Sequence, residues 1–269
     1  MQTMETLVSE KNSLLKEVRR ASAHGSLTPE GLAVAEGFHL LEEALRSRCE
    51  ISVVIAGESV KTTVAAHVRG LKHTRVVVVS DGNFEKLAST DTPQGVIALV
   101  RPPAWTLDQL LRGRPLVILL DGIQDPGNAG AIVRAAEAFG ATGAAFLSGS
   151  VSPYNPKCLR ASAGSLFRLP VATALDESLL AVAFEQKRVK LFAAHPRAEK
   201  LVFETDLTGA CAIVIGAEGR GVSPTLLRRS TAVRIPTSGV ESLNAAVAAG
   251  VMLYEASRQR ARQPAVGEP

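Results

Sequence analysis

The first third of the chain carries apolar residues at helical spacing, followed by short apolar runs. The helical spacing predicts one helix over Ser9–Ala23 and a second over Ala35–Arg46, in which Phe38, Leu41 and Leu45 fall on one buried face. Short apolar runs bounded by polar stretches then predict strands at Ile51–Ala56, Val76–Ser80 and Val96–Val100. The pattern therefore predicts a small α/β unit in this part of the chain.

Beyond residue 114 the alternation of strand and helix is more regular. Apolar runs that are too short for helices and lack polar alternation predict strands buried on both faces of a parallel sheet, at Leu116–Leu120, Ala144–Leu147, Val189–Ala194 and Cys211–Ile215. Helices are expected over Gly130–Phe139, with Gly140 just past the end, and over Ser242–Arg262, with Ser242 as the N-cap. The fold class expected here is α/β with a parallel sheet.

Two consecutive prolines separate these parts. Pro102 and Pro103 stiffen the chain and remove backbone donors, which is typical of a linker. The predicted organisation is a smaller domain at 1–101, a linker at 102–114, a larger domain at 115–262 and a disordered tail at 263–269.

Composition narrows the class of protein without deciding its chemistry. The chain has 269 residues, 46% hydrophobic and 21% charged, which suits a globular protein of two domains. No apolar run reaches the roughly 18 residues of a membrane span, and the amino terminus lacks the apolar core of a signal peptide, so we expect a cytoplasmic protein without membrane contact. Scattered cysteines (Cys49, Cys158 and Cys211) and dispersed histidines predict no metal site. The net charge of +4 suits a polyanionic partner.

Three segments place glycine, proline or small polar residues just after predicted strands, where loops meet ligands in α/β proteins. These segments are Asn128–Arg134, Gly216–Gly221 and Ile235–Asn244. By residue type alone, Asn128 is compatible with a helix cap, and Arg134 with a surface pair to Glu137 or with a phosphate-binding guanidinium. Glu218 occupies the position of the second glycine in a dinucleotide fingerprint, which disfavours a dinucleotide-dependent oxidoreductase.

In this order and spacing, the three segments resemble the signature motifs of the SpoU (SPOUT-class) RNA 2′-O-ribose methyltransferases. Asn128 and Arg134 fall on the family motif N-x-G-x-x-x-R, and Gly216 and Glu218 fall on G-x-E-x-x-G. The third segment departs from the family at Thr237, where methionine is usual after Ile-Pro. The resemblance implies S-adenosylmethionine as methyl donor and a ribose hydroxyl of rRNA or tRNA as acceptor.

The resemblance also implies roles for individual residues. It gives a catalytic set of Arg134, Asn128, Glu218, Ser242 and Asn244, and cofactor contacts from Gly216, Ile235 and Leu243. Arg134 is expected to hold a phosphate and stabilise the developing alkoxide, because a guanidinium is too reluctant to lose a proton to act as a base. Glu218 is expected to organise the site by hydrogen bonding to Asn128 or to a neighbouring loop.

Further implications concern the fold and the partners. The family resemblance implies a trefoil knot in a methyltransferase domain at 115–262, and a homodimer whose interface includes the final helix and the region of the first motif. The part at 1–101 resembles a ribosomal-protein-like RNA substrate-binding domain, with RNA contacts expected from Lys11, Lys16, Arg19 and Arg20. A fourth segment, Asn155–Phe167, also resembles the family, and the candidate phosphate contacts near it are Lys157, Arg160 and Arg168.

One alternative from another class stays open at this point. A catalytically inactive RNA-binding protein would retain the same fold and cofactor pocket but would not need Asn128, Arg134, Glu218 and Asn244 together. Transfer of a labelled methyl group to RNA separates the enzyme from this alternative.

Overall fold

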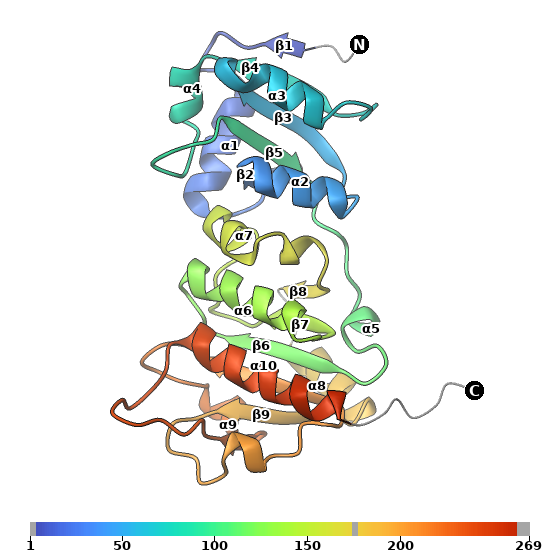
Figure 1. Ribbon diagram of the computed structural model, residues 1–269, viewed down its shortest axis with the longest axis vertical. Coiled ribbons are helices and arrows are strands. Elements are labelled where there is room, and N and C mark those ends of the chain that lie inside the picture. Colours follow the sequence, from blue (N-terminus) through green and yellow to red (C-terminus); the bar gives the residue numbers. More distant parts are fainter. Residues whose placement is uncertain (1–3, 174–176, 263–269) are drawn as a thin grey trace, which may run out of the picture. The chain divides into compact units, whose positions relative to one another are not determined.

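A computed structural model describes residues 4–173 and 177–262 of the chain (Figure 1). The chain divides into two compact units. The first unit runs to Ala104 and includes Tyr154–Arg168, and the second comprises Trp105–Pro153 and the chain from Leu169 onward. The tail at 263–269, predicted to be disordered, lies outside the described residues.

The first unit is built on a mixed five-stranded sheet in the order β1-β4-β3-β5-β2. Its strands are β1 (Met4–Thr6), β2 (Ala33–Glu36), β3 (Ile51–Gly57), β4 (Arg75–Val79) and β5 (Val96–Val100). Its helices are α1 (Ser13–His24), α2 (Phe38–Arg46), α3 (Lys61–His67), α4 (Asp81–Glu85) and α7 (Pro156–Ser162), with short 3₁₀ turns at Glu58–Val60 and Ser165–Phe167. Strand β4 pairs in parallel with β1 and β3, whereas β5 runs antiparallel to β2 and β3.

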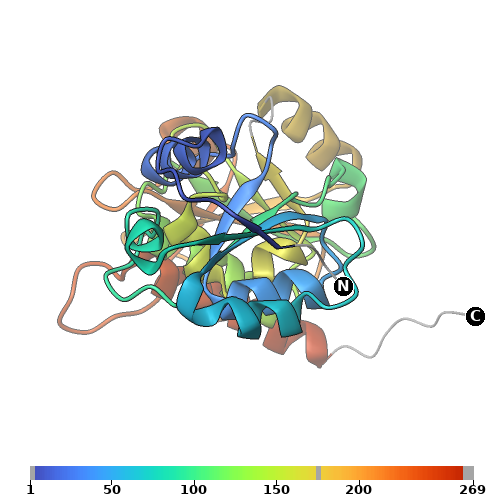
Figure 2. The same ribbon diagram turned by 90° about the horizontal axis from the view of Figure 1, so that it is seen from above.

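Helices cover both faces of this sheet. Helices α2 and α3 lie on one face and α1 lies on the other (Figures 1 and 2). One core cluster joins Leu15 and Val18 of α1 to Ile97 and Leu99 of β5, all of them buried. Alternate residues of one strand point to opposite faces, so the buried strands hold helices on both sides.

The sequence pattern located most of these elements but put the starts of two helices too early. The helix predicted from Ser9 begins at Ser13. The strands predicted over Ile51–Ala56, Val76–Ser80 and Val96–Val100 are present within one residue of the expected bounds. The helix predicted from Ala35 is wrong at its start, because 33–36 is strand β2 and the helix begins at Phe38. Gly37, with a φ of 99°, makes the break between the two elements, and a left-handed φ favours glycine.

The second unit is built on a six-stranded sheet in the order β11-β9-β10-β6-β7-β8, in which every neighbouring pair is parallel. Its strands are β6 (Leu116–Asp121), β7 (Gly143–Phe146), β8 (Val171–Thr173), β9 (Lys190–Ala194), β10 (Cys211–Gly216) and β11 (Thr231–Val233). Its helices are α5 (Leu107–Leu110), α6 (Pro126–Ala138), α8 (Glu177–Gln186), α9 (Pro224–Arg228) and α10 (Ala245–Ala261), with a 3₁₀ turn at Val202–Glu204. The predicted parallel α/β sheet is confirmed.

Helices α6 and α10 pack against each other on one face of this sheet, and α8 lies on the other face (Figures 1 and 2). Arg260 fixes the end of α10, because its guanidinium donates to the backbone oxygens of Arg114, Pro115, Leu207 and Gly209. The final helix is thereby held against the loops at the amino-terminal ends of β6 and β10. The trefoil knot implied by the resemblance stays a prediction.

In the second unit, the starts of α6 and α10 differ from the sequence expectation. Helix α6 begins at Pro126, four residues earlier than predicted, and its N-cap is Asp125, whose carboxylate accepts from the backbone N–H of Asn128 at 2.7 Å. Helix α10 is capped by Asn244 and not by Ser242. Gly140 lies just past the end of α6 with a φ of 75°, as predicted.

Candidate active site

The carboxyl ends of β6 and β10 lie side by side at the point where the order of the strands across the parallel sheet reverses. From β6 the chain continues to β7 on one side, whereas from β10 it continues to β11 on the other side. In open parallel sheets such a switch point leaves a crevice at the strand ends where ligands bind. The segments that follow these two strands carry Asn128 and Glu218.

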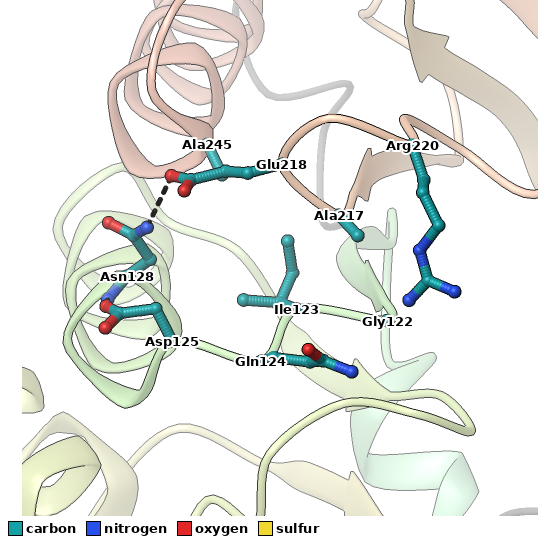
Figure 3. A pocket seen from close by; sticks show the side chains of 9 residues that line it. All are labelled: Gly122, Ile123, Gln124, Asp125, Asn128, Ala217, Glu218, Arg220 and Ala245. Carbon is teal, nitrogen blue, oxygen red and sulfur yellow. Dashed lines mark hydrogen bonds between the residues drawn. The ribbon is translucent and has the colours of Figure 1, made fainter.

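A hydrogen-bonded cluster of three side chains occupies this crevice. Asn128 Nδ2 donates to Glu218 Oε1 at 2.7 Å (Figure 3). Asn244 Nδ2 donates to the same carboxylate oxygen at 3.1 Å and to Asn128 Oδ1 at 3.0 Å. The hydrogen bond expected between Glu218 and Asn128 is therefore present. Two amide donors on one carboxylate oxygen fix the direction of the Glu218 side chain.

Asn244 connects this cluster to the start of α10. Its Oδ1 accepts from the backbone N–H groups of Ala246 at 2.9 Å and Val247 at 3.3 Å, which is the hydrogen bonding of an N-cap. One side chain thus uses its oxygen for the helix and its nitrogen for the site. Because the cap fixes the side chain on a rigid element, the amide group is pre-positioned for Glu218.

The loop after β10 is folded tightly at Gly216. A Cβ at this position would lie 2.1 Å from the carbonyl carbon of Gly221 and 2.1 Å from the nitrogen of Val222, so no other residue fits without moving the backbone. The loop is closed by a bond from the Gly221 N–H to the Ala217 oxygen and tied to β6 by a bond from the Ser223 N–H to Asp121 Oδ2. Two glycines with positive φ, Gly219 and Gly221, complete the turn.

A cavity of about 760 Å³ opens beside this loop. It is lined by segments that follow β9, β10 and β11, and it contains the predicted residues Gly216, Ile235, Ser242, Leu243 and Asn244. The pocket wall also includes Thr237, whose hydroxyl donates to the Val240 oxygen at 3.0 Å and so pins the exposed loop before α10. The predicted cofactor positions therefore share one cavity.

A second cavity of about 180 Å³ adjoins the first (Figure 3). The two share Ala217, Glu218 and Ala245 in their walls. The smaller cavity is lined further by Asn128 and by side chains from the segment after β6 and the loop after β10: Gly122, Ile123, Gln124, Asp125 and Arg220. The Asn128–Glu218 pair thus lies where the cavities meet.

The structure does not bring Arg134 to either cavity. Arg134 is exposed on α6 and lines neither space. Six residues along a helix place its side chain about 9 Å further along the axis and about 120° around it from Asn128. Within one chain, Arg134 is therefore separate from the cluster.

Sequence reasoning missed several residues of these cavities. The segment after β9, Ala194–Arg197, lines the larger cavity, and Gln124 lines the smaller one. A signal for 194–197 was present in the sequence. These residues follow the carboxyl end of a predicted parallel strand, as the other loops of the site do. Arg220 lies inside the second motif, but residue type and spacing gave it no role.

The predicted RNA-binding residues lie in the first unit. Lys11 precedes α1, and Lys16, Arg19 and Arg20 lie on α1; all four are exposed. Of these four side chains, only that of Arg19 has a hydrogen-bond partner within the described part of the chain, the backbone oxygen of Lys86 at 3.4 Å. The helix therefore presents basic side chains to solvent, which fits contact with phosphates without testing it.

Two of the candidate phosphate contacts near Asn155–Phe167 are already paired. Arg160 forms an ion pair with the buried Glu36 at 3.4 Å and donates to Ser89 Oγ at 2.8 Å. Arg168 pairs with the buried Glu43. Each arginine compensates a buried carboxylate of the same unit, so both side chains already have a structural role, and their contact with phosphate stays a prediction.

Within the described residues, none of the helices combines the length and apolar character needed to cross a membrane. In the same part of the chain, no group of three or more His, Cys, Asp or Glu side chains is arranged to hold a metal ion.

Comparison with known proteins decides the family. Residues 115–254 match the SpoU rRNA Methylase family, and residues 12–98 match the MRM3-like substrate binding domain. The chain belongs to the SpoU rRNA methylase family. The motif at Asn128–Arg134 and the cluster around Glu218 lie inside the first match, and α1 lies inside the second.

Relatives of this SpoU protein match almost its whole length. An uncharacterized tRNA/rRNA methyltransferase of Synechocystis sp. is 35% identical over 263 residues, covering 95% of this chain and 94% of that protein. The 23S rRNA (guanosine(2553)-2'-O)-methyltransferase RlmP of Bacillus subtilis is 29% identical, covering 93% and 98%. The crystal structure of the SpoU methyltransferase AviRb from Streptomyces viridochromogenes in complex with AdoMet matches with a TM-score of 0.85 at 26% identity, covering 94% of this chain and all of that one.

Proposed function

We propose that the protein transfers a methyl group from S-adenosylmethionine to the ribose 2′-hydroxyl of a nucleotide in ribosomal RNA. Family membership makes it an S-adenosylmethionine-dependent RNA methyltransferase of the SpoU type. The observation that carries the assignment of the site is the cluster of Asn128, Glu218 and Asn244 at the junction of two cavities. Ribosomal RNA is favoured as substrate by relatives named for 23S rRNA, and action on such an RNA implies a cytoplasmic protein.

The larger cavity suits the methyl donor. Its volume of about 760 Å³ lies within the roughly 300–1,000 Å³ of small-molecule sites. Ile235 and Leu243 supply apolar wall, and the glycine loop after β10 lets a ligand approach the backbone closely. We assign the cofactor contacts to Gly216, Ile235 and Leu243. S-adenosylmethionine, when bound, supplies an activated methyl group.

The residues of the chain then have to position an acceptor and stabilise charge. Glu218, held by the two asparagine amides, orients the polar groups at the junction where the acceptor ribose meets the cofactor cavity. Ser242 lines the same cavity. The 2′-hydroxyl gives up its proton to solvent, and the oxygen carries negative charge until its bond to the methyl carbon is complete. The bond from that methyl group to sulfur breaks at the same time, so the cofactor would leave as the neutral thioether. We assign Arg134 to the adjoining phosphate and to this charge, because a fixed guanidinium stabilises an alkoxide without losing its own proton.

A homodimer reconciles that role with the position of Arg134. Helix α10 exposes Val247, Val251 and Tyr254, which lie at helical spacing on one side. Tyr254 stacks edge-on against Phe139, the residue just after α6, with ring centroids 5.7 Å apart. An exposed apolar stripe of this kind marks a protein interface. Since Arg134 faces solvent on the helix packed against α10, we propose that it reaches the substrate at the site of the second copy.

The domain roles follow the same proposal. Residues 1–101 are assigned to RNA binding through Lys11, Lys16, Arg19 and Arg20, with 102–114 as linker and 115–262 as the methyltransferase domain. The inactive alternative explains less, because it gives no reason for Asn128, Glu218 and Asn244 to be joined in one cluster.

The test is transfer of labelled methyl from S-adenosylmethionine to 16S and 23S rRNA transcripts. Methylation of the 2′-oxygen blocks alkaline cleavage at that linkage, so the label should appear in alkali-resistant dinucleotides. Arg134→Ala should slow single-turnover transfer by on the order of a hundredfold. Cofactor affinity and dimer mass should stay at wild-type values. Wild-type turnover by Arg134→Ala would refute the role of this residue, and label in alkali-sensitive products would refute ribose methylation.

A further inference from the structure

The smaller cavity has a wall that the methyl transfer itself does not use. Figure 3 shows the Asn128–Glu218 pair on one side of the cavity and the Arg220 side chain on the other, with Gln124 between them. Its volume of about 180 Å³ is much smaller than the 760 Å³ of the larger cavity, so it has room for a planar group and not for a second cofactor. Whatever enters it lies against the junction with the larger cavity.

Arg220 and Gln124 are available to a ligand. Neither side chain has a hydrogen-bond or ion-pair partner within residues 4–173 and 177–262. Gly122 lies beside Arg220, because a Cβ there would be in ordinary van der Waals contact with the Ala217 Cβ at 3.7 Å and with Arg220 Nη2 at 4.0 Å. A guanidinium fork and an amide group therefore face one small cavity without internal partners.

The charges of the cavity select among the groups that an arginine binds. Glu218 lines the same space, so the negative charge of a phosphate would lie near a carboxylate as well as near the guanidinium. A neutral base meets no such repulsion. The two parallel donors of a guanidinium fit the adjacent O6 and N7 acceptors of guanine, whereas adenine places an amino donor at the position of O6.

We propose that the smaller cavity holds the base of the acceptor nucleotide and that Arg220, with Gln124, selects guanine through its O6 and N7 edge. This inference rests on the proposed ribose methylation. It places the base against Arg220 and the ribose beside Asn128 and Glu218, next to the cofactor cavity. Sequence-specific RNA recognition commonly uses such unstacked single bases held in a protein pocket.

The experiment compares 16S and 23S rRNA transcripts made with GTP or with 7-deaza-GTP, which removes the N7 acceptor. Single-turnover transfer at subsaturating RNA is measured for the wild type, Arg220→Ala, Arg220→Lys and Arg228→Ala. Arg228→Ala is the control, because it removes the same charge as Arg220→Ala. Arg228 is exposed on α9 and lines neither cavity. Cofactor affinity is measured by calorimetry for each variant.

The wild type and Arg228→Ala should methylate a guanosine and lose about tenfold in transfer efficiency on the 7-deaza transcript, because one bond to a charged donor is removed. Arg220→Ala should lose at least as much on the GTP transcript and show no further loss on the 7-deaza transcript. Arg220→Lys should behave like Arg220→Ala, since an ammonium lacks the fork. Cofactor affinity should be the same in all four proteins.

Two results would overturn the base pocket while leaving ribose methylation intact. One is a methylated nucleotide other than guanosine, and the other is a 7-deaza penalty in Arg220→Ala equal to that of the wild type. Absence of transfer by the wild type to every transcript would instead overturn the proposed function, and the base pocket with it.

Discussion

Asn244 has two separable functions, and substitutions can divide them. Its Oδ1 caps α10 through Ala246 and Val247, and its Nδ2 donates to Glu218 and Asn128. Asn244→Ala removes both functions. Asn244→Ser keeps an oxygen for the cap and removes the amide donor, because serine is a good N-cap residue.

The magnitudes follow from these interactions. Loss of an N-cap costs about 1 kcal/mol, which lowers the melting temperature of a domain of this size by roughly 2–4 °C. The bond to the Glu218 carboxylate is exposed, so we take the lower end of the range for charged hydrogen bonds, about 1.5 kcal/mol, or about tenfold in rate. Asn244→Ala should show both effects, and Asn244→Ser should show the loss of rate with a nearly unchanged melting temperature.

The assay is single-turnover methyl transfer alongside calorimetric unfolding. Thr106→Ala is the matched control, because Thr106 caps α5 in the same unit and lines neither cavity. It should lower the melting temperature without slowing transfer. Wild-type transfer by Asn244→Ser would refute the reasoning that the amide of Asn244 organises Glu218.

Four further predictions follow, one on the loop after β10, one on the RNA-binding helix and two on the dimer. Gly216→Ala should abolish S-adenosylmethionine binding in calorimetry, because its Cβ would overlap the backbone of Gly221, whereas Gly209→Ala, where a Cβ meets nothing within 4 Å, should bind normally. Neutralising Lys11, Lys16, Arg19 and Arg20 together should reduce the slope of the logarithm of the RNA-binding constant against the logarithm of salt concentration. The slope should fall by roughly 0.7 to 0.9 for each phosphate that is no longer neutralised. An unchanged slope would exclude this helix from phosphate binding. Tyr254→Asp should give a monomer in light scattering and Phe203→Asp, at the same 55% exposure, should not. Mixing inactive Arg134→Ala and Glu218→Ala protomers should restore about a quarter of the activity if Arg134 acts across a two-fold dimer, and none if it acts within one chain.

The parts of the fold that sequence could predict are those set by local pattern. The runs at 116–120 and 211–215 are wholly apolar and too short for helices, so the sequence alone predicts that they are buried strands. The strands β1, β8 and β11 have three residues each, which is too short for a periodic signal. The sequence pattern puts the N-cap of α10 two residues early, because Ser242 and Asn244 are both good caps and only the path of the loop decides between them.

In the candidate site, too, local motifs predict which residues take part, whereas the tertiary fold determines which of them are in contact. Family motifs located Asn128, Glu218 and Asn244 and implied the bond between Asn128 and Glu218, but the bond from Asn244 to Asn128 joins residues 116 positions apart and was not expected. The pairing of Arg160 with Glu36 spans 124 residues and was not predictable from residue type. Long-range partners of this kind are a property of the tertiary fold, so local pattern does not determine them.

Methylation of the ribose 2′-oxygen of RNA is the activity on which every role above depends. A map of 2′-O-methyl positions across the total RNA of cells with and without the gene tests it in the cell. One or more ribosomal RNA positions should lose the modification when the gene is removed and regain it with the wild type but not with Arg134→Ala. Identical maps with and without the gene would contradict the proposed activity.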